Sequence, residues 1–242
     1  MKRILSVVTE LLFALTMYAI AAILFALALT PAVVLIFKTW FKVQSAGLLF
    51  KSFTVGLSLG CGFFIFGLTL VLFAGLFRCV FRLRLKEGNY RIPSAGAFKW
   101  AFVNSLYVII QYTFIDFILL TPFANVLLRL MGAKMGKNVH INSKNIGDIS
   151  LLELGDNSVV GGNATVICHS VEHGVLKLHK VKIGKNVTIG MNAIIMPGCE
   201  IGDNALIGAG AVLLKNTKIG PREIWYGVPA QNIRPKHEAE KG

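Results

Sequence analysis

Residues 183–219 read IGKNVTIGMNAIIMPGCEIGDNALIGAGAVLLKNTKI, and an aliphatic side chain recurs in this stretch at every sixth position. The recurring positions are Ile183, Ile189, Ile195, Ile201, Ile207, Leu213 and Ile219. A step of six matches neither the 3.6-residue period of a helix nor the alternation of a strand, so it indicates a short strand followed by a sharp turn. The same step joins Met135 to Ile141, and Leu154 to Val160 and Val166.

Each repeat also carries small and turn-forming residues at fixed places. Glycine often follows the aliphatic position. A small residue lies four places after the aliphatic position, and asparagine commonly stands just before that small residue. Glycine and asparagine supply corners where φ is positive. Three repeats close one triangular coil, so residues 131–236 are predicted to form a parallel β-helix of about four coils, stacked at the strand spacing of about 4.8 Å. Residues 237–242 form a short tail.

The N-terminal part of the chain is apolar enough to use lipid as its solvent. Residues 11–37 and 52–77 contain no charged side chain, and about 20 apolar residues suffice to cross a bilayer. Residues 1–99 are therefore predicted to be a region of transmembrane α-helices. The alternative is a secretory signal, because Met1-Lys2-Arg3 opens the chain and Ala26-Leu27-Ala28 resembles a cleavage site. The first apolar run is too long for that alternative.

The charge distribution indicates the partners and the orientation. The net charge of +13 divides into +9 over residues 1–130 and +4 over residues 131–242. Basic residues beside apolar segments favour anionic membrane lipids as partners, not nucleic acid. The largest basic cluster, between residues 78 and 99, is expected on the cytoplasmic side. The expected location is thus a bacterial inner membrane, as a multi-pass protein with its C-terminal domain on the cytoplasmic face.

Residues 100–130 are largely apolar but carry Asn104, Gln111 and Asp116. They form either a third membrane helix with a polar stripe or an amphipathic helix in the interface. The interfacial alternative is favoured because it keeps the C-terminal domain on the side of the basic cluster.

The repeat is interrupted between Val166 and Ile183, which lie 17 residues apart. Three of the five histidines fall in this interval, namely His169, His173 and His179. A loop that leaves a rigid scaffold is a usual place for catalytic groups, and histidine suits proton transfer because it titrates near neutral pH.

Two stretches carry a resemblance to the hexapeptide-repeat acyltransferases, which include sugar and serine acetyltransferases. Residues 225–234 read WYGVPAQNIR and resemble the closing signature of that family, and residues 207–212 read IGAGAV and resemble its acyl-CoA-lining coil. Residues 78–236 are also similar to the membrane-embedded C-terminal region of polylysine-type nonribosomal peptide synthetases, here as a standalone chain. The resemblance implies left-handed winding of the β-helix, a homotrimer and an acetyl-CoA or other acyl-CoA donor.

The resemblance also implies roles for individual residues. His169 matches the general base, Glu172 would orient or polarise the imidazole, and His173 is a second candidate base. Contacts with coenzyme A would carry over to Gly208, Ala209, Trp225, Pro229 and Ala230, with Lys215, Arg234 and Lys236 as cations for its phosphates.

The predicted function is an acyltransferase that moves an acyl group, in the simplest case acetyl, to a hydroxyl or amine of a lipid-linked or amphipathic acceptor. Two alternatives are an amide-forming transferase and a non-catalytic trimeric membrane scaffold. A zinc site is not expected, because the spacing of His140, His169, His173 and His179 does not reproduce the three-histidine pattern of related β-helical enzymes.

Overall fold

The computed structural model describes residues 2–233, with side chains from residue 7 onward. The chain forms two compact units. The first contains residues 2–80 and 105–114, and the second contains residues 81–104 and 115–233.

The first unit is dominated by two long apolar helices. They are α1 (Lys2–Lys42) and α2 (Leu48–Val80), and both are long and apolar enough to cross a membrane by length and composition. The hydroxyl of Thr69 in α2 donates to the carbonyl oxygen of Ala28 in α1 at 2.9 Å. A Cβ at Gly62 would lie 3.5 Å from Ala32 Cβ, so small residues let these two helices pack closely.

The segment expected to be one helix is divided. The structure has α3 (Ala95–Thr113), the short 3-10 helix η1 (Ile115–Phe117) and α4 (Pro122–Leu130). Thr121 caps α4, because its side chain accepts a hydrogen bond from the Phe123 N–H, and Pro122 occupies the first turn. Proline lacks the N–H that a continuing helix needs, so it starts a new helix here.

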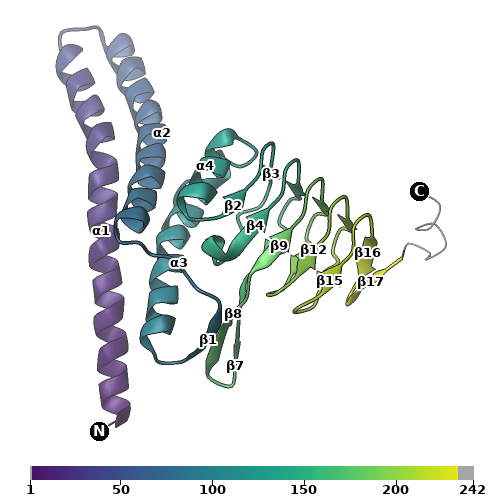
Figure 1. Cartoon of the computed structure of the whole chain (residues 1–242). Coiled ribbons are helices and arrows are strands. Elements are labelled where there is room, and N and C mark those ends of the chain that lie inside the picture. The colour runs from purple at the N-terminus through teal and green to yellow at the C-terminus, as the bar shows by residue number, and fades with distance from the viewer. Residues whose placement is uncertain (1, 234–242) are drawn as a thin grey trace. The chain divides into compact units, whose positions relative to one another are not determined.

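The second unit is built mainly of short strands (Figure 1). Their bounds are β1 (Gly88–Arg91), β2 (Lys134–Met135), β3 (His140–Ile141), β4 (Leu152–Leu154), β5 (Val159–Val160), β6 (Thr165–Val166), β7 (His169–Glu172), β8 (Val175–Leu178), β9 (Val181–Ile183), β10 (Thr188–Ile189), β11 (Ile194–Ile195), β12 (Glu200–Ile201), β13 (Leu206–Ile207), β14 (Val212–Leu213), β15 (Lys218–Ile219), β16 (Ile224–Gly227) and β17 (Ala230–Asn232). A further 3-10 helix, η2 (Ile149–Leu151), precedes β4.

The strands form three parallel faces that run along the stack of coils. Their orders are β3-β5-β10-β13-β16, β6-β11-β14 and β2-β4-β9-β12-β15. Ile189 pairs with Ile207, and Ile201 pairs with Ile219, so neighbouring strands of a face lie 18 residues apart in the chain. Three six-residue repeats therefore make one coil of a β-helix, as predicted.

The positions of the six-residue step fill the interior. From Ile141 to Ile219, every aliphatic residue of the repeat is at most 5% exposed. The small residues Ala193, Cys199 and Ala211 are fully buried beside them. A close-packed column of aliphatic side chains is what holds so narrow a solenoid together.

Both asparagine and glycine are predicted at corners with positive φ, but in the structure this conformation belongs to the repeat position that asparagine commonly occupies. Seven repeat asparagines have positive φ: Asn138, Asn157, Asn163, Asn186, Asn192, Asn204 and Asn216. The glycine that follows the aliphatic position serves close approach instead. A Cβ on Gly161 would lie only 2.8 Å from the Ile189 carbonyl oxygen and the Met191 nitrogen of the next coil.

Two departures from the 18-residue pairing locate insertions in the coils. Val160 pairs with Ile189, 29 positions later, because an antiparallel hairpin of β7 and β8 leaves the stack between them. Ile141 pairs with Val160, 19 positions later, so one extra residue lies in the loop that contains η2. Strand β1, which precedes α3 in the chain, pairs with β8 and completes a three-stranded arm beside the coils (Figure 1).

Candidate functional site

The hairpin arm positions His169 at its base. His169 opens β7, and His173-Gly174 forms the two-residue turn at the tip, with φ of 49° and 75°. Two consecutive positive φ values are typical of the tight turns that match strand twist. The arm is thus a regular two-stranded hairpin, and the His169 side chain at its base is 30% exposed.

His169 contacts a carboxylate from the other interruption of the repeat. Its Nδ1 lies 2.6 Å from Asp148 Oδ2. A carboxylate only accepts hydrogen bonds, so Nδ1 must carry the proton of this contact. In the neutral ring this leaves the lone pair of Nε2 free to accept a proton.

Asp148 precedes η2 and is held in an unusual environment. It is 0% exposed, and its backbone is left-handed, with φ 54° and ψ 42°. The carboxylate accepts four hydrogen bonds. Oδ1 receives Trp100 Nε1–H at 2.6 Å and Asn104 Nδ2–H at 3.0 Å, and Oδ2 receives the Cys168 N–H at 3.1 Å in addition to His169.

These contacts keep Asp148 ionised. Burial, the largest single influence, raises the pKa of the carboxyl group. The hydrogen bond and charge of His169, together with the hydrogen bonds from Asn104 and Trp100, outweigh burial and bring the pKa below its ordinary value.

Asp148 is not among the site residues predicted from the sequence. Its signal was the 13-residue interval between Ile141 and Leu154, which breaks the step of six just as the interval before Ile183 does. Both members of the pair lie in such breaks, so the breaks identify the site better than the histidines alone.

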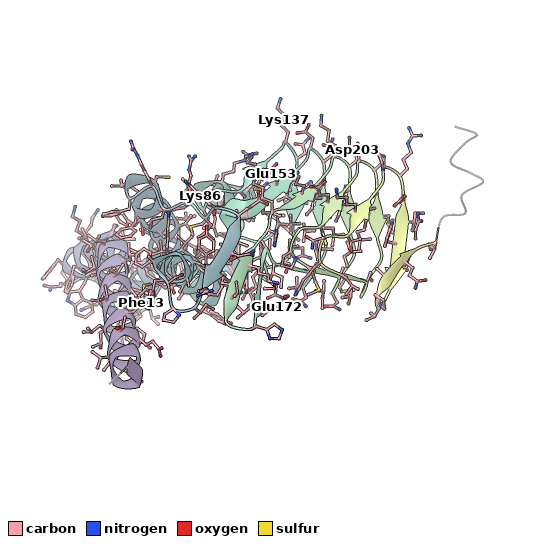
Figure 2. The ribbon with its side chains drawn as sticks, turned by 60° about the horizontal axis from the view of Figure 1, so that its bottom comes forward. Phe13, Lys86, Lys137, Glu153, Glu172 and Asp203 are labelled. Atoms are coloured by element: carbon pink, nitrogen blue, oxygen red, sulfur yellow. The ribbon has the colours of Figure 1, made fainter. Side chains whose placement is uncertain are left out.

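Glu172 does not contact the imidazole. Three positions separate it from His169 along a strand, so the two side chains leave opposite faces. Glu172 instead pairs with Lys177 at 2.7 Å and with Lys215, and Ser170 Oγ lies 3.3 Å from Glu172 Oε1. In Figure 2 it lies on the arm, at the opposite side of the coils from Lys137 and Asp203. The carboxylate that contacts the imidazole is that of Asp148 and not that of Glu172.

Among residues 2–233, the side chains of His140, His173 and His179 form no hydrogen bond with Asp148 or His169. His173 is exposed at the tip of the arm, and His140 is exposed in β3. The backbone N–H of His179 donates to the Cys168 carbonyl oxygen at 2.9 Å. Within residues 2–233, no three His, Cys, Asp or Glu side chains gather in a way that could hold a metal ion.

The residues predicted to bind a donor are distributed over the last coils. Gly208 is buried, and a Cβ there would meet the ring of Tyr226, so this ring covers it. Ala209 is exposed, and the space beside Gly210 is open. Lys215 is engaged by Glu172. Within residues 207–212, Ala209 and Gly210 are therefore the exposed ones.

The closing signature lies at the last described strands. Trp225 Nε1–H donates to Glu223 Oε2 at 2.8 Å, and Pro229 is exposed. Ala230 pairs with Gly227 across β16 and β17. Arg234 and Lys236 lie outside the described residues.

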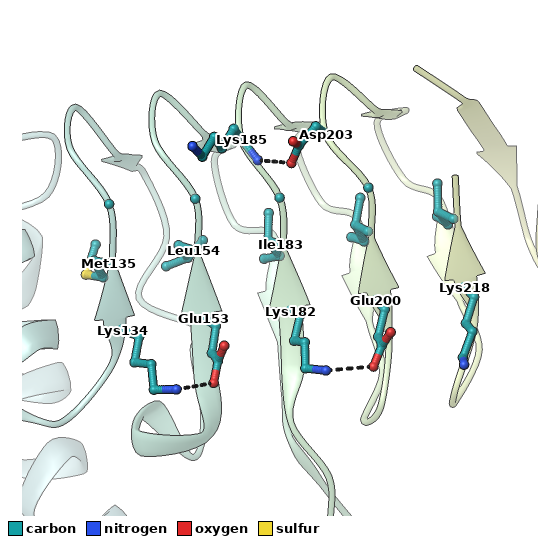
Figure 3. A pocket seen from close by; sticks show the side chains of 16 residues that line it. Lys134, Met135, Glu153, Leu154, Lys182, Ile183, Lys185, Glu200, Asp203 and Lys218 are labelled. Atoms are coloured by element: carbon teal, nitrogen blue, oxygen red, sulfur yellow. Dashed lines mark hydrogen bonds and ion pairs between the residues drawn. The ribbon is translucent and has the colours of Figure 1, made fainter. Parts of the chain in front are cut away.

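A large surface hollow of about 620 Å³ lies on a different face. It follows β2, β4, β9, β12 and β15, where lysine and glutamate alternate from coil to coil (Figure 3). Lys134 pairs with Glu153 at 2.8 Å, and Lys182 pairs with Glu200 at 2.9 Å. No histidine lines this hollow. Four lysines and three carboxylates line it, several of them paired with one another, and it offers no imidazole, so we do not assign the reaction to it.

Comparison with known proteins agrees with the repeat. Residues 180–215 carry the bacterial transferase hexapeptide repeat (six repeats). This match confirms the resemblance noted from the sequence. Delta-poly-L-ornithine synthetase of Acinetobacter baumannii (strain AB307-0294) is 26% identical over 149 residues, which cover 59% of this chain and 11% of that protein. The chain therefore spans about a tenth of the length of this curated relative.

Two solved structures are similar to the chain. A maltose O-acetyltransferase from Clostridium difficile 630 gives a TM-score of 0.47 at 23% identity, over 62% of this chain and 93% of that one. A hexapeptide-repeat-containing acetyltransferase from Vibrio cholerae O1 biovar eltor, complexed with acetyl coenzyme A, gives a TM-score of 0.49 at 18% identity. The match covers 64% of this chain and 96% of that one.

Proposed function

We propose that this protein is a membrane-anchored acyltransferase with His169 as its general base. The observation that carries the proposal is the contact between His169 Nδ1 and the buried carboxylate of Asp148, at 2.6 Å. This contact presents Nε2 as the proton acceptor and stabilises the imidazolium that forms. The repeat match at residues 180–215 and the donor-lining resemblance at residues 207–212 support acyl-CoA as the donor.

The proposed reaction balances with these groups. Nε2 of His169 removes the proton from the acceptor hydroxyl or amine while its oxygen or nitrogen attacks the thioester carbonyl carbon. The tetrahedral intermediate expels the coenzyme A thiolate, which takes the proton back from the imidazolium. Asp148 stays ionised throughout and keeps the ring oriented. Ala209, Trp225, Pro229 and Ala230 would hold the donor.

Membrane anchoring defines the acceptor in this proposal. Helices α1 and α2 would span the membrane as a hairpin, and the basic residues between 78 and 99 would keep the coils at the cytoplasmic face of a bacterial inner membrane. An enzyme fixed at that surface meets a lipid-linked or amphipathic acceptor. We further propose left-handed winding, about four coils, and a homotrimer.

The test uses the full chain in lipid nanodiscs with acetyl-CoA and extracted bacterial lipids. Release of free coenzyme A thiol and the gain of one acyl group on a lipid, seen by mass spectrometry, are expected. His169→Gln should abolish both, whereas His173→Gln in the turn of the same hairpin should retain them. Equal activity in the two variants would overturn the assignment of His169.

One observation favours an amide product as a second candidate. The relative that aligns with this chain over 149 residues is, by its name, a poly-ornithine synthetase. An amine acceptor would then replace the hydroxyl, with the same base. Alkaline hydroxylamine releases the acyl group from an oxygen ester and leaves it on an amide, so this treatment of the acylated product decides between them.

A further inference from the structure

Two of the four donors to Asp148 come from outside the repeat. Trp100 and Asn104 lie in α3, which precedes all coils in the chain. Four positions separate them, so both face the same side of the helix. They bind the same oxygen, Oδ1, and leave Oδ2 to His169 and to the Cys168 N–H.

A buried carboxylate depends on such donors. Removal of an ionised carboxyl group from water is strongly unfavourable unless hydrogen bonds replace its hydration. Asp148 is 0% exposed, so protein groups must supply all of that replacement. If the two donors to Oδ1 were lost, the carboxyl group would become easier to protonate and freer to rotate. Either change would remove the acceptor that fixes the proton of His169 on Nδ1.

Asn104 also fixes the backbone of Asp148. Its Oδ1 accepts the Asp148 N–H at 3.1 Å while its Nδ2–H donates to the Asp148 carboxylate at 3.0 Å. The carboxamide thus binds a residue in the left-handed region at two points, and that conformation is unfavourable for most side chains. The Nδ2 group is itself positioned by the Trp100 carbonyl oxygen at 3.1 Å.

Trp100 contacts both members of the pair. Its Nε1–H binds Asp148 at 2.6 Å, and its ring centroid lies 4.9 Å from that of His169, with the planes at 63°. The indole therefore restricts rotation of the imidazole as well as of the carboxylate. The loss of a hydrogen bond to an ionised group changes an equilibrium by roughly 10-fold or more.

The same segment of chain holds the arm that carries His169. β1 pairs with β8 along four residues, and Glu87 Oε1 accepts the Lys180 N–H at 3.0 Å. Residues 87–104 thus contact the arm on one side and Asp148 on the other.

We infer that Trp100 and Asn104 are positioning residues that hold the Asp148 carboxylate in the orientation in which it fixes the proton of His169 on Nδ1. The segment between the apolar helices and the coils, residues 87–104, therefore completes the site, and the hexapeptide coils alone do not contain it. The inference rests on the proposed function for its catalytic meaning. Its structural content, the tautomer of His169, does not depend on that function.

The test compares Trp100→Phe and Asn104→Leu in the full chain, labelled with ¹⁵N-histidine, in nanodiscs. Trp100→Phe keeps an aromatic ring and removes the N–H, and Asn104→Leu keeps the side-chain size and removes both hydrogen bonds. Above the pH at which histidine is charged, the wild type is expected to show a single Nδ1–H tautomer for His169. Each variant is expected to show a mixture of tautomers and a roughly 10-fold or greater loss of acyl transfer.

Matched controls separate positioning from a general loss of structure. Trp40→Phe in α1 and Asn125→Leu in α4 make the same chemical changes elsewhere, and both should keep the single tautomer. Asn125 Nδ2–H donates to the Val139 carbonyl oxygen at 2.8 Å, as Asn104 Nδ2–H does to that of Trp100. Asn125→Leu therefore also removes a hydrogen bond from an asparagine side chain to the backbone. Circular dichroism identifies any variant that fails to fold. If Asn104→Leu fails to fold, Trp100→Phe, the milder change, carries the test.

Each outcome is decisive. A folded Trp100→Phe variant that keeps the single tautomer and wild-type turnover would overturn the inference. A tautomer mixture in a protein that shows no acyl transfer in any form would support the positioning role and refute the proposed function instead.

Discussion

Asp148 Oδ2 lies 2.6 Å from His169 Nδ1, although neither residue occupies a position of the six-residue repeat. Each belongs to one of the two insertions that shift the pairing of the coils. The regular coils bury aliphatic side chains and expose a uniform surface, so they offer few places for a buried charge. The insertions bring polar groups together beside this rigid frame, which is a common way to build a reactive site.

Asp148→Asn should remove most of the acyl transfer while the fold is kept. The carboxamide can direct an N–H at the imidazole, which then favours the proton on Nε2 and loses its free lone pair there. Comparable changes in histidine-dependent enzymes reduce turnover by roughly 10³–10⁴-fold. The measurement is coenzyme A release by the full chain in nanodiscs. Asp156→Asn, on the exposed side of a coil, is the control and should stay within a few-fold of wild type.

The same carboxylate predicts how stability depends on pH. Since its pKa is lower in the folded state, Asp148 contributes stability that is fully present above its unfolded pKa of about 3.9 and is lost as the pH falls through the folded value. The free energy of unfolding of wild type minus that of Asp148→Asn should therefore decrease as the pH falls below about 4. Chemical denaturation of both proteins along this pH series tests it. A difference that grows on acidification would contradict the assigned direction.

Glu172→Gln should leave acyl transfer within about threefold of wild type. Glu172 pairs with Lys177 and Lys215 and is one-third exposed, and such ion pairs contribute about 0–1 kcal/mol. The change also frees Lys215, so the Kd for coenzyme A should fall slightly if Lys215 contacts its phosphates. Titration calorimetry with coenzyme A and the turnover assay measure both effects. A loss as large as that of His169→Gln would restore Glu172 to the orienting role that the sequence analysis gave it.

The sequence predicted the frame well because its physics is local and periodic. Every aliphatic position of the step from Ile183 to Ile219 is buried, and every asparagine placed at a corner has positive φ. The arm was located from a single irregular interval. These features depend only on spacing along the chain, and spacing is visible in one sequence.

The partners of the polar side chains were not predictable in the same way. Asn104 and Asp116 are predicted to lie in one helix that spans the membrane or lies in its interface. In the structure Asn104 binds Asp148, while Asp116 follows the end of α3 and pairs with Lys144 at 2.7 Å. Glu172 is near His169 in sequence but on the other face of its strand. Contacts between distant segments depend on tertiary packing, which a repeat pattern does not encode.

Ile189→Ala tests whether the interior column carries the stability of the coils. Ile189 is 1% exposed, and its strand pairs with a strand on each side, so truncation leaves a cavity that neighbouring coils cannot fill. A loss of about 2–5 kcal/mol in the free energy of unfolding is expected. Thr188→Ala removes the exposed neighbour on the same strand and should cost less than about 1 kcal/mol. The two values come from urea denaturation of the full chain in detergent micelles, followed by circular dichroism. Both substitutions replace a β-branched residue of the same two-residue strand by alanine. Equal losses would therefore mean that strand propensity, and not the buried column, determines the stability of the solenoid.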